Sequence, residues 1–299
     1  MCIIFALYYA TAKIMKNTTY IFRIKCPDAY GIVAKVSTSL NDMDIFIMDS
    51  SFFSDPSTKS YFMRLKIFSS KGEIEFSNFS NAFNEACSDL KMEWTLENEA
   101  SSPNTLVFVS KYGHCLQDLL YKNSIDSLKM NVCGIVSNHE NLKTIADNYS
   151  IPFFHIKNNS EIREKAEDAI EGLINDNNIE LMILARYMQI FSSDFCLKYS
   201  GKVINIHHSF LPSFKGAKPY KQAYEKGVKI MGATAHYITE ELDAGPIIEQ
   251  TVERVDHSQS PEELELIGQD IESITLTRAV KKHLEGKVFI NDKKTVVFD

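Results

Sequence analysis

Apolar residues follow two different periods along the chain, and the change between them divides it into two parts. In the first part, short stretches in which every second residue is apolar, as in strands, alternate with stretches of helical spacing. Strands are predicted at residues 19–25, 45–53, 60–67 and 91–96, and helices over 31–42 and 76–90. This β-α-β-β-α-β order predicts a small ferredoxin-like domain.

The same spacing predicts which side chains form the core of that domain. On the strands, the inward residues are Tyr20, Phe22, Ile24, Ile45, Ile47, Tyr61, Met63, Leu65 and Ile67. On the helices, they are Val33, Val36 and Leu40, followed by Phe76, Phe79, Phe83 and Leu90. Both helices would bury these stripes against the sheet.

Longer helical stretches alternate with continuous apolar strands in the second part. The strands are predicted at 106–109, 132–136, 179–185 and 203–206, and the helices near 113–123, 139–149, 160–175 and 191–199. A hairpin at the sheet edge is predicted at 232–238 and 246–255, before a long helix over 261–286 with Pro261 in its first turn and Gly286 at its end. The pattern predicts a Rossmann-like, mostly parallel α/β sheet covered on both faces.

A polar stretch of small residues, 97–104, separates the two parts. It reads ENEASSPN, and this composition is typical of a linker between domains. We therefore expect a first domain over 18–97, a linker over 98–104 and a second domain over 105–299.

Composition and charge exclude several classes of partner. The chain has 299 residues, of which 44% are hydrophobic and 24% charged, with a net charge of −7. It lacks the basic surplus expected of a nucleic-acid-binding protein or of one that binds an anionic membrane surface. No stretch after the N-terminus is apolar for long enough to cross a bilayer. We expect a cytoplasmic protein.

The six cysteines, at positions 2, 26, 87, 115, 133 and 196, form no CxxC pair and have no zinc-ligand spacing. They indicate reduced thiols, although the sequence leaves a single disulfide open. We expect no metal site.

The N-terminal stretch is treated separately. Its apolar run over 2–10 is too short to span a membrane and lacks a preceding basic segment. We expect that residues 1–14 are a frayed leader or the result of an early start codon, with Met15 as the working start.

The candidate chemistry lies at the end of the strand 203–206, in the segment NIHHSFLPSFKG that begins at Asn205. Asn205 and His207 are two residues apart, so on an extended backbone they point to the same side. There an amide N–H could polarise a carbonyl group and a neutral imidazole could pass a proton.

Asp243 would complete this site from the hairpin loop EELDAGP, where Gly245 permits a tight turn. A carboxylate beside His207 would orient the imidazole and could take a proton from water. Each residue alone has an ordinary explanation, since polar residues at strand ends usually satisfy backbone groups and an Asp before Gly-Pro usually shapes a turn. Only their combination favours catalysis.

The segment 205–212 resembles the N-I-H-x-S-x-L-P motif of folate-dependent formyltransferases, and 242–248 resembles their L-D-x-G-P-I-I loop. The resemblance extends from about residue 18 to 299 and is closest to the formyltetrahydrofolate deformylases. Three features carry it: His208, where transformylases usually have proline, and the segments 216–229 and 109–120.

The resemblance implies a hydrolase that converts 10-formyltetrahydrofolate to formate and tetrahydrofolate, supplies formate for purine synthesis and balances the one-carbon folate pool. Asn205 would hold the oxyanion, His207 would shuttle a proton to the departing nitrogen, and Asp243 would position water. No metal or other cofactor would be needed.

The resemblance also suggests residues that contact the folate substrate. The segment LARYMQI would line the pterin pocket with Arg186, Tyr187, Met188 and Ile190, although Met188 and Ile190 could instead pack in the core. The other candidate contacts are Ser137, His208, Gly216 and His236. For His236, a hydrogen-bonded core histidine is the favoured alternative.

The first domain resembles the ACT domain, a small regulatory module, through its turn at 26–33. Asp44 and Phe46 stand where that family usually has glycine and asparagine. These departures argue against an amino-acid effector and favour a domain that only dimerises, by sheet or helix pairing. The resemblance implies a homodimer or homotetramer.

Two other functions are alternatives to hydrolysis. A formyltransferase acting on an amine would need a glycine-rich phosphate cradle near residue 113, where only Gly113 is present. A folate sensor that has lost catalysis would lack one of the three catalytic candidates, and all are present. We hypothesise that His208 and residues 214–221 exclude the amine.

Overall fold

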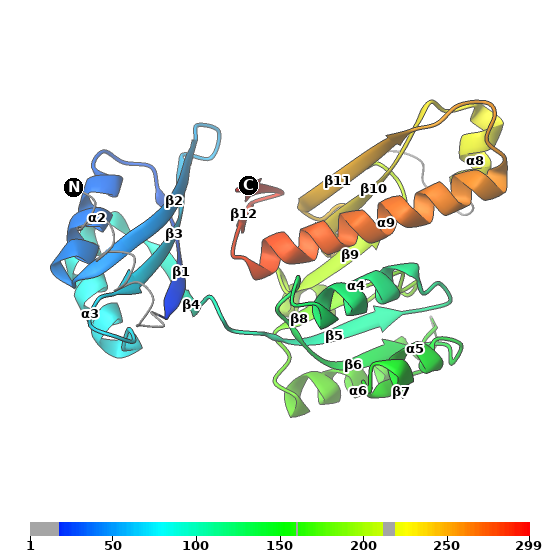
Figure 1. The fold of residues 1–299 in the computed structure, drawn as a ribbon, viewed down its shortest axis with the longest axis horizontal. Coiled ribbons are helices and arrows are strands. Elements are labelled where there is room, and N and C mark those ends of the chain that lie inside the picture. The colour runs from blue at the N-terminus through cyan, green and yellow to red at the C-terminus, as the bar shows by residue number, and fades with distance from the viewer. Residues whose placement is uncertain (1–17, 160, 212–218) are drawn as a thin grey trace, which may run out of the picture. The chain divides into compact units, whose positions relative to one another are not determined.

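The computed structural model of the chain describes residues 18–159, 161–211 and 219–299 (Figure 1). The expected leader, 1–14, lies outside the described residues. The chain divides into two compact units, Met1–Ser101 and Ser102–Asp299. This division falls inside the range expected for the linker.

The first unit is a four-stranded antiparallel sheet of order β2-β3-β1-β4 with two helices. Its elements are β1 (Thr19–Pro27), α2 (Ile32–Asp42), β2 (Ile45–Asp55), β3 (Ser60–Ser69), α3 (Phe76–Ala86), a 3-10 turn (Ser88–Leu90) and β4 (Glu93–Asn98). The order of strands and helices is the predicted one.

Phe22 lies at the centre of this unit's core, where its ring meets Phe79 at 5.1 Å and Phe83 at 4.9 Å. Two predicted core positions are wrong. Val33 is 40% exposed, because α2 turns Ile32 toward the sheet instead. Phe76 is 58% exposed, because it is the first residue of α3 and precedes the buried stripe. Leu90 packs on the core from the 3-10 turn after the helix.

The second unit contains a seven-stranded sheet of order β11-β10-β9-β8-β5-β6-β7. The strands from β9 to β7 pair in parallel, and β10 and β11 extend the sheet as an antiparallel edge. The strands are β5 (Asn104–Val109), β6 (Asn131–Ser137), β7 (Phe153–His155), β8 (Leu181–Leu184), β9 (Val203–His207), β10 (Ile230–Tyr237) and β11 (Ile247–Arg254). The predicted mostly parallel α/β sheet is confirmed.

Helices cover both faces of this sheet. One core contains apolar residues of α4 (His114–Ser124), α5 (Lys143–Asn148) and α9 (Pro261–Leu284). The other contains residues of α6 (Arg163–Asp176) and α7 (Ser193–Lys198). Four elements of this unit were not predicted from the sequence. They are strand β7, helix α8 (Pro219–Lys226) and the two strands of a terminal hairpin, β12 (Val288–Asn291) and β13 (Lys294–Val297).

Helix α9 runs along β9, β10 and β11 (Figure 1). Its start is fixed by a capping box, in which Ser260 accepts from the Glu263 N–H and Glu263 accepts from the Ser260 N–H. Pro261 occupies the first turn, as predicted. After the last turn, Gly286 adopts φ 64°, the left-handed conformation that glycine favours.

The order in which strands are added to the sheet reverses at β5. Strands β6 and β7 follow on one side of β5, whereas β8 and β9 follow on the other. In open α/β sheets such a switch point opens a crevice at the carboxyl ends of the strands. The loops after β8 and β9 therefore border a natural binding site.

No helix in the described part of the chain combines the length and the apolar character that crossing a membrane requires. The described cysteines, Cys26, Cys87, Cys115, Cys133 and Cys196, are all free thiols.

Candidate active site

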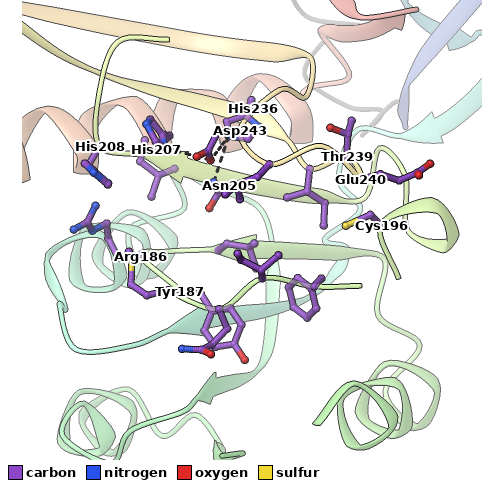
Figure 2. Close-up of a pocket in the computed structure, with 18 residues that line it drawn as sticks. Arg186, Tyr187, Cys196, Asn205, His207, His208, His236, Thr239, Glu240 and Asp243 are labelled. Carbon is purple, nitrogen blue, oxygen red and sulfur yellow. Dashed lines mark hydrogen bonds and ion pairs between the residues drawn. The ribbon is translucent and has the colours of Figure 1, made fainter. Parts of the chain in front are cut away.

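A pocket of about 310 Å³ lies at the carboxyl ends of β8 and β9 (Figure 2). It is lined by the loop after β8, by the last residues of β9 with His208, and by the loop between β10 and β11. All three predicted catalytic residues, Asn205, His207 and Asp243, line this one pocket.

His207 and Asp243 form an ion pair, with 3.2 Å between Nδ1 and Oδ1. Burial alone would raise the pKa of Asp243, but favourable interactions, first among them the hydrogen bond from His207, outweigh burial and hold that pKa well below its usual range. Asp243 is therefore a carboxylate at neutral pH. It can keep the Nδ1 proton of His207 in place and can accept a proton from a neighbouring water.

Asn205 and His236 face each other across the β9–β10 pair, with 3.3 Å between Nδ2 and Nε2. His236 Nδ1 lies 2.8 Å from the carbonyl oxygen of Tyr237, so Nδ1 carries the proton that is donated there. In the neutral ring, Nε2 then accepts from the Asn205 amide. This bond orients the amide and leaves its second N–H free for a ligand.

His236 combines features of the two interpretations, and its predicted contact with the substrate stays a prediction. It is 2% exposed and hydrogen-bonded like a core histidine, yet it lines the pocket, and its Nε2 is 3.8 Å from Asp243 Oδ1.

The sequence predicted that Gly245 permits the tight turn of the loop that carries Asp243, but Gly245 does not have a left-handed φ. Asp243 itself adopts the left-handed φ of 56°. Gly245 is required for another reason, since a Cβ atom there would lie 1.7 Å from the carbonyl oxygen of Tyr237. The glycine allows the loop to approach β10 closely, and this approach brings Asp243 to His207.

Ser209 is a site residue that the sequence reasoning did not single out. Its Oγ lies 2.8 Å from Nε2 of His207, so His207 is held at both ring nitrogens. Ser209 is 6% exposed and does not line the pocket, which makes it a positioning residue and not a nucleophile. The S in the N-I-H-x-S motif was the available signal.

A buried network holds the turn that follows β9. Thr234 Oγ1 donates to the carbonyl oxygen of Ser209 at 3.0 Å and accepts from the N–H of Leu211. Gln250 donates to Thr234 Oγ1 and to the carbonyl oxygen of Leu211. The antiparallel edge strands therefore fix the position of Ser209, and through it that of His207.

His208 stacks on His207, with ring centroids 4.8 Å apart. Burial, followed by the nearby charges of Arg186 and His207, lowers the pKa of His208 to about 4. His208 is therefore a neutral wall of the pocket at physiological pH.

The predicted folate contacts after β8 line the pocket: Arg186, Tyr187, Met188 and Ile190. Met188 is 56% and Ile190 57% exposed, so the alternative of core packing is wrong for both. The loop is anchored by its backbone, since the Met188 N–H donates to Ser110 Oγ at 3.0 Å.

Two other predicted contacts are not placed there. Ser137 is fully buried, its hydroxyl accepts from the His139 N–H, and it is not among the residues that line the pocket. The predicted substrate contact at Ser137 is therefore wrong, because this side chain closes the turn after β6. Gly216 lies outside the described residues.

Within the described residues, one group has the side chains of a metal site: His114, Cys115 and Glu272. The Glu272 carboxylate is already bound by His114, Arg186 and Tyr220. Burial raises the pKa of the Cys115 thiol well above its usual range, which disfavours the thiolate that a metal would need. This donor set does not fit a metal.

Comparison with known proteins identifies the relatives of the chain. Residues 103–280 match the model of the formyl transferase family. A formyltetrahydrofolate deformylase of Bacillus subtilis (strain 168) is 40% identical over 92% of this chain and 92% of its own, and one of Escherichia coli (strain K12) is 34% identical over 93% and 97%. The chain belongs to the formyltetrahydrofolate deformylase family.

Solved structures agree with this assignment. The formyltetrahydrofolate deformylase from Burkholderia mallei superposes with a TM-score of 0.90 and 40% identity, covering 94% of this chain and all of its own. The phosphoribosylglycinamide formyltransferase from Anaplasma phagocytophilum has a TM-score of 0.60 and 31% identity, covering 67% of this chain and 96% of its own. Proteins named as deformylases and as a formyltransferase therefore share the fold over the parts of the chain that these matches cover.

Proposed function

We propose that this protein hydrolyses 10-formyltetrahydrofolate to formate and tetrahydrofolate, with Asn205, His207 and Asp243 as its catalytic residues. The observation that carries the proposal is the His207–Asp243 ion pair of 3.2 Å beside the oriented Asn205 amide in one pocket. The names and the 34–40% identity of the relatives support the same reaction.

The geometry supports a mechanism based on water. The free N–H of Asn205 stabilises the oxygen of the formyl group as negative charge develops on it. Asp243 accepts a proton from the attacking water, and His207 donates its Nδ1 proton to N10 of the folate as the C–N10 bond breaks. Asp243 then returns the proton from water to Nδ1 of His207. The products are tetrahydrofolate and formic acid, which loses its remaining acidic proton at neutral pH.

The loop after β8 supports a pterin site in the same pocket. Exposed Met188 and Ile190 offer apolar surface to a flat ring, and Tyr187 is held from behind by Asn158, whose Nδ2 donates to the Tyr187 hydroxyl at 3.0 Å. Folate is the small-molecule partner we propose. The mechanism assigns no step to a metal or to another cofactor, and we place the protein in the cytoplasm.

We infer that the first unit is an ACT-like domain that joins copies of the chain into a homodimer or homotetramer. Strand β2 is an edge of its sheet and presents exposed apolar side chains: Phe46, Met48, Phe52 and Phe53. Edge strands with apolar side chains are commonly covered by a partner.

An amino-acid effector is not part of the proposal. Asp44 has φ 57° at the position where the ACT family usually has glycine, and its carboxylate is paired with Lys71 at 2.5 Å. The backbone conformation that suits glycine is kept, while a charged side chain occupies the site.

The proposed function is tested by release of formate from 10-formyltetrahydrofolate without an acceptor. Asp243→Asn should lower kcat by at least about 100-fold, because it removes the proton acceptor. Glu241→Gln is the matched control, since it makes the same change of charge on an exposed side chain of the same loop outside the pocket.

Two outcomes would contradict the proposal. Formate release by Asp243→Asn at the rate of the unchanged protein would exclude the assigned role. No formate release by the unchanged protein would exclude the reaction. EDTA should leave the rate unchanged, and a loss of rate that added metal restores would contradict the metal-free mechanism.

A further inference from the structure

A buried carboxylate that the proposed reaction does not use lies behind the active site. Glu272, on α9, is 1% exposed. Its carboxylate is bound by His114 at 2.7 Å, by the Tyr220 hydroxyl, and by Arg186, whose Nε is 3.4 Å away. Hydrogen bonds from His114 and Tyr220 and the charge of Arg186 outweigh burial and lower the pKa of Glu272, so it stays ionised. The cluster joins α4, α8, α9 and the loop after β8.

Arg186 connects this cluster with the pocket. Of the four residues, only Arg186 lines the pocket, and Figure 2 shows its guanidinium directed toward the ring of His208. Behind it the space is filled. The Tyr112 ring lies 5.4 Å from the guanidinium, and the Tyr220 ring packs so closely on α9 that a Cβ at Gly268 would lie 2.2 Å from it.

Both the backbone conformation and the hydrogen bonding of Arg186 are unfavourable. Its φ of 66° is unfavourable for any residue with a Cβ atom. Its Nε and Nη1 are buried and make no hydrogen bond to the described residues. Unfavourable features of this kind are retained mainly where function requires them. The guanidinium fills space and supplies charge beside His208, whose ring stacks on that of His207.

The position of Arg186 in the lining of the pocket bears on which acceptor the protein uses. The name of the Anaplasma relative specifies formyl transfer to phosphoribosylglycinamide, whereas the deformylase names specify removal of the formyl group. The fold of the second unit is common to both. The discrimination must therefore come from side chains that decide which nucleophile has room beside the formyl carbon.

We propose that Arg186, held by Glu272 and backed by Tyr220, is the specificity-determining residue that excludes amines and leaves water as the acceptor. This inference rests on the proposed function. Water and an amine would attack the same formyl carbon, and in both cases the C–N10 bond breaks and N10 gains a proton. The amine would keep the formyl group as a new formamide, but its substituent needs the volume that Arg186 occupies.

The test measures how the formyl group is divided between water and glycinamide. The protein is given 10-formyltetrahydrofolate with an excess of glycinamide, and formate and N-formylglycinamide are quantified, with an enzyme-free blank subtracted. Arg186→Gly suits the φ of 66° and empties the space. Arg186→Met is the matched control, because it removes the charge and keeps most of the volume.

We expect Arg186→Gly to raise the ratio of N-formylglycinamide to formate by at least about tenfold, the usual scale of steric discrimination in a pocket, while Arg186→Met stays near the original ratio. Tyr220→Ala, compared with Tyr220→Phe, should shift the ratio in the same direction and carries the test if Arg186→Gly does not fold.

The inference is overturned if folded Arg186→Gly and Tyr220→Ala divide the formyl group as the unchanged protein does. It is also overturned if the unchanged protein already transfers the group to glycinamide as readily as to water. Failure of the proposed function would appear differently, as an absence of formate release by the unchanged protein without any amine.

Discussion

The half-buried carboxylate of Asp243 and the buried carboxylate of Glu272 show how the surroundings of a residue decide its role. Burial would raise the pKa of each, and in both cases hydrogen-bond donors and positive charge lower it instead. Asp243 keeps 26% of its side chain exposed and faces the pocket, so it can exchange a proton with water. Glu272 is closed off by its three partners and can only hold them in place.

The Asn205 amide gives the first prediction at this scale. Asn205→Ala removes the donor assigned to the oxyanion and should lower kcat by about 100-fold or more, with a smaller change in KM. Steady-state formate release measures both constants. An unchanged kcat in Asn205→Ala would exclude this role for the amide.

His208 predicts a dependence of stability on pH. Its pKa is lowered from 6.5 to about 4 on folding, so between these values the unfolded chain binds a proton that the folded protein does not. Stability therefore falls as the pH falls through this window. From pH 7 to pH 5, the protein should lose about 1–2 kcal/mol more free energy of unfolding than His208→Gln. Urea unfolding at both pH values measures this difference, and equal losses would contradict it.

At the scale of elements, the antiparallel edge of the sheet assembles the chemistry. β9 supplies Asn205 and His207, β10 supplies His236, and the loop before β11 supplies Asp243. Because Asn205 and His236 are register partners, their contact follows from strand pairing alone. Asp243 depends in addition on the close approach of its loop to β10.

Gly245→Ala tests that dependence. The added Cβ would lie 1.7 Å from the Tyr237 carbonyl oxygen, so the loop must move and Asp243 must shift away from His207. We expect kcat to fall at least about tenfold and the free energy of unfolding to fall by about 1–3 kcal/mol. Gly172→Ala in α6, where a Cβ meets nothing within 4 Å, is the control and should be neutral or stabilising.

The sequence predicts most of these elements because their apolar periods are strong. The prediction fails where a single residue decides which side chain faces the core, and where an element is too short to show a period. The alternatives Ile32 and Val33 differ by one position, and the left-handed Gly31 before α2 sets which of them faces the sheet. The strand β7 has only three residues, too few for a visible period. The helix over 139–149 shrinks to Lys143–Asn148 because turns occupy both ends.

The residues of the site were likewise predictable only where a sequence motif identifies them. The three catalytic candidates are identifiable because two short motifs carry them, Asn205 and His207 in the segment 205–212 and Asp243 in the segment 242–248. The partners of Glu272 come from positions 114, 186 and 220, so no local pattern could join them. The position of Ser137 was misjudged because a residue that ends a strand can face either the crevice or the turn, and spacing does not distinguish the two.

At the scale of the whole molecule, two units with separate cores divide the tasks. The second contains the entire pocket, and the first exposes the apolar edge β2. Assembly through β2 would join copies of the chain without a change in the residues that line the pocket.

Phe46→Glu tests this mode of assembly. Phe46 is 53% exposed and lies 5.3 Å from Phe68. A charge there should weaken self-association at least about tenfold, as for a residue central to an interface. Sedimentation measures the mass against concentration. Phe76→Glu, at a similarly exposed Phe on α3, is the control, and an unchanged mass for Phe46→Glu would exclude β2 as the interface.

The left-handed Arg186 has a consequence for protein engineering. A procedure that chooses each residue by its fit to the local backbone would replace this arginine with glycine and would gain about 1–3 kcal/mol of relieved strain. The same exchange would deprive Glu272 of its only cationic partner among arginine and lysine side chains of the described chain. Backbone conformation favours glycine at this position, and the charge of Glu272 favours arginine. Under the role proposed for Arg186, a substitution chosen by local backbone fit alone would therefore lower the selectivity for water.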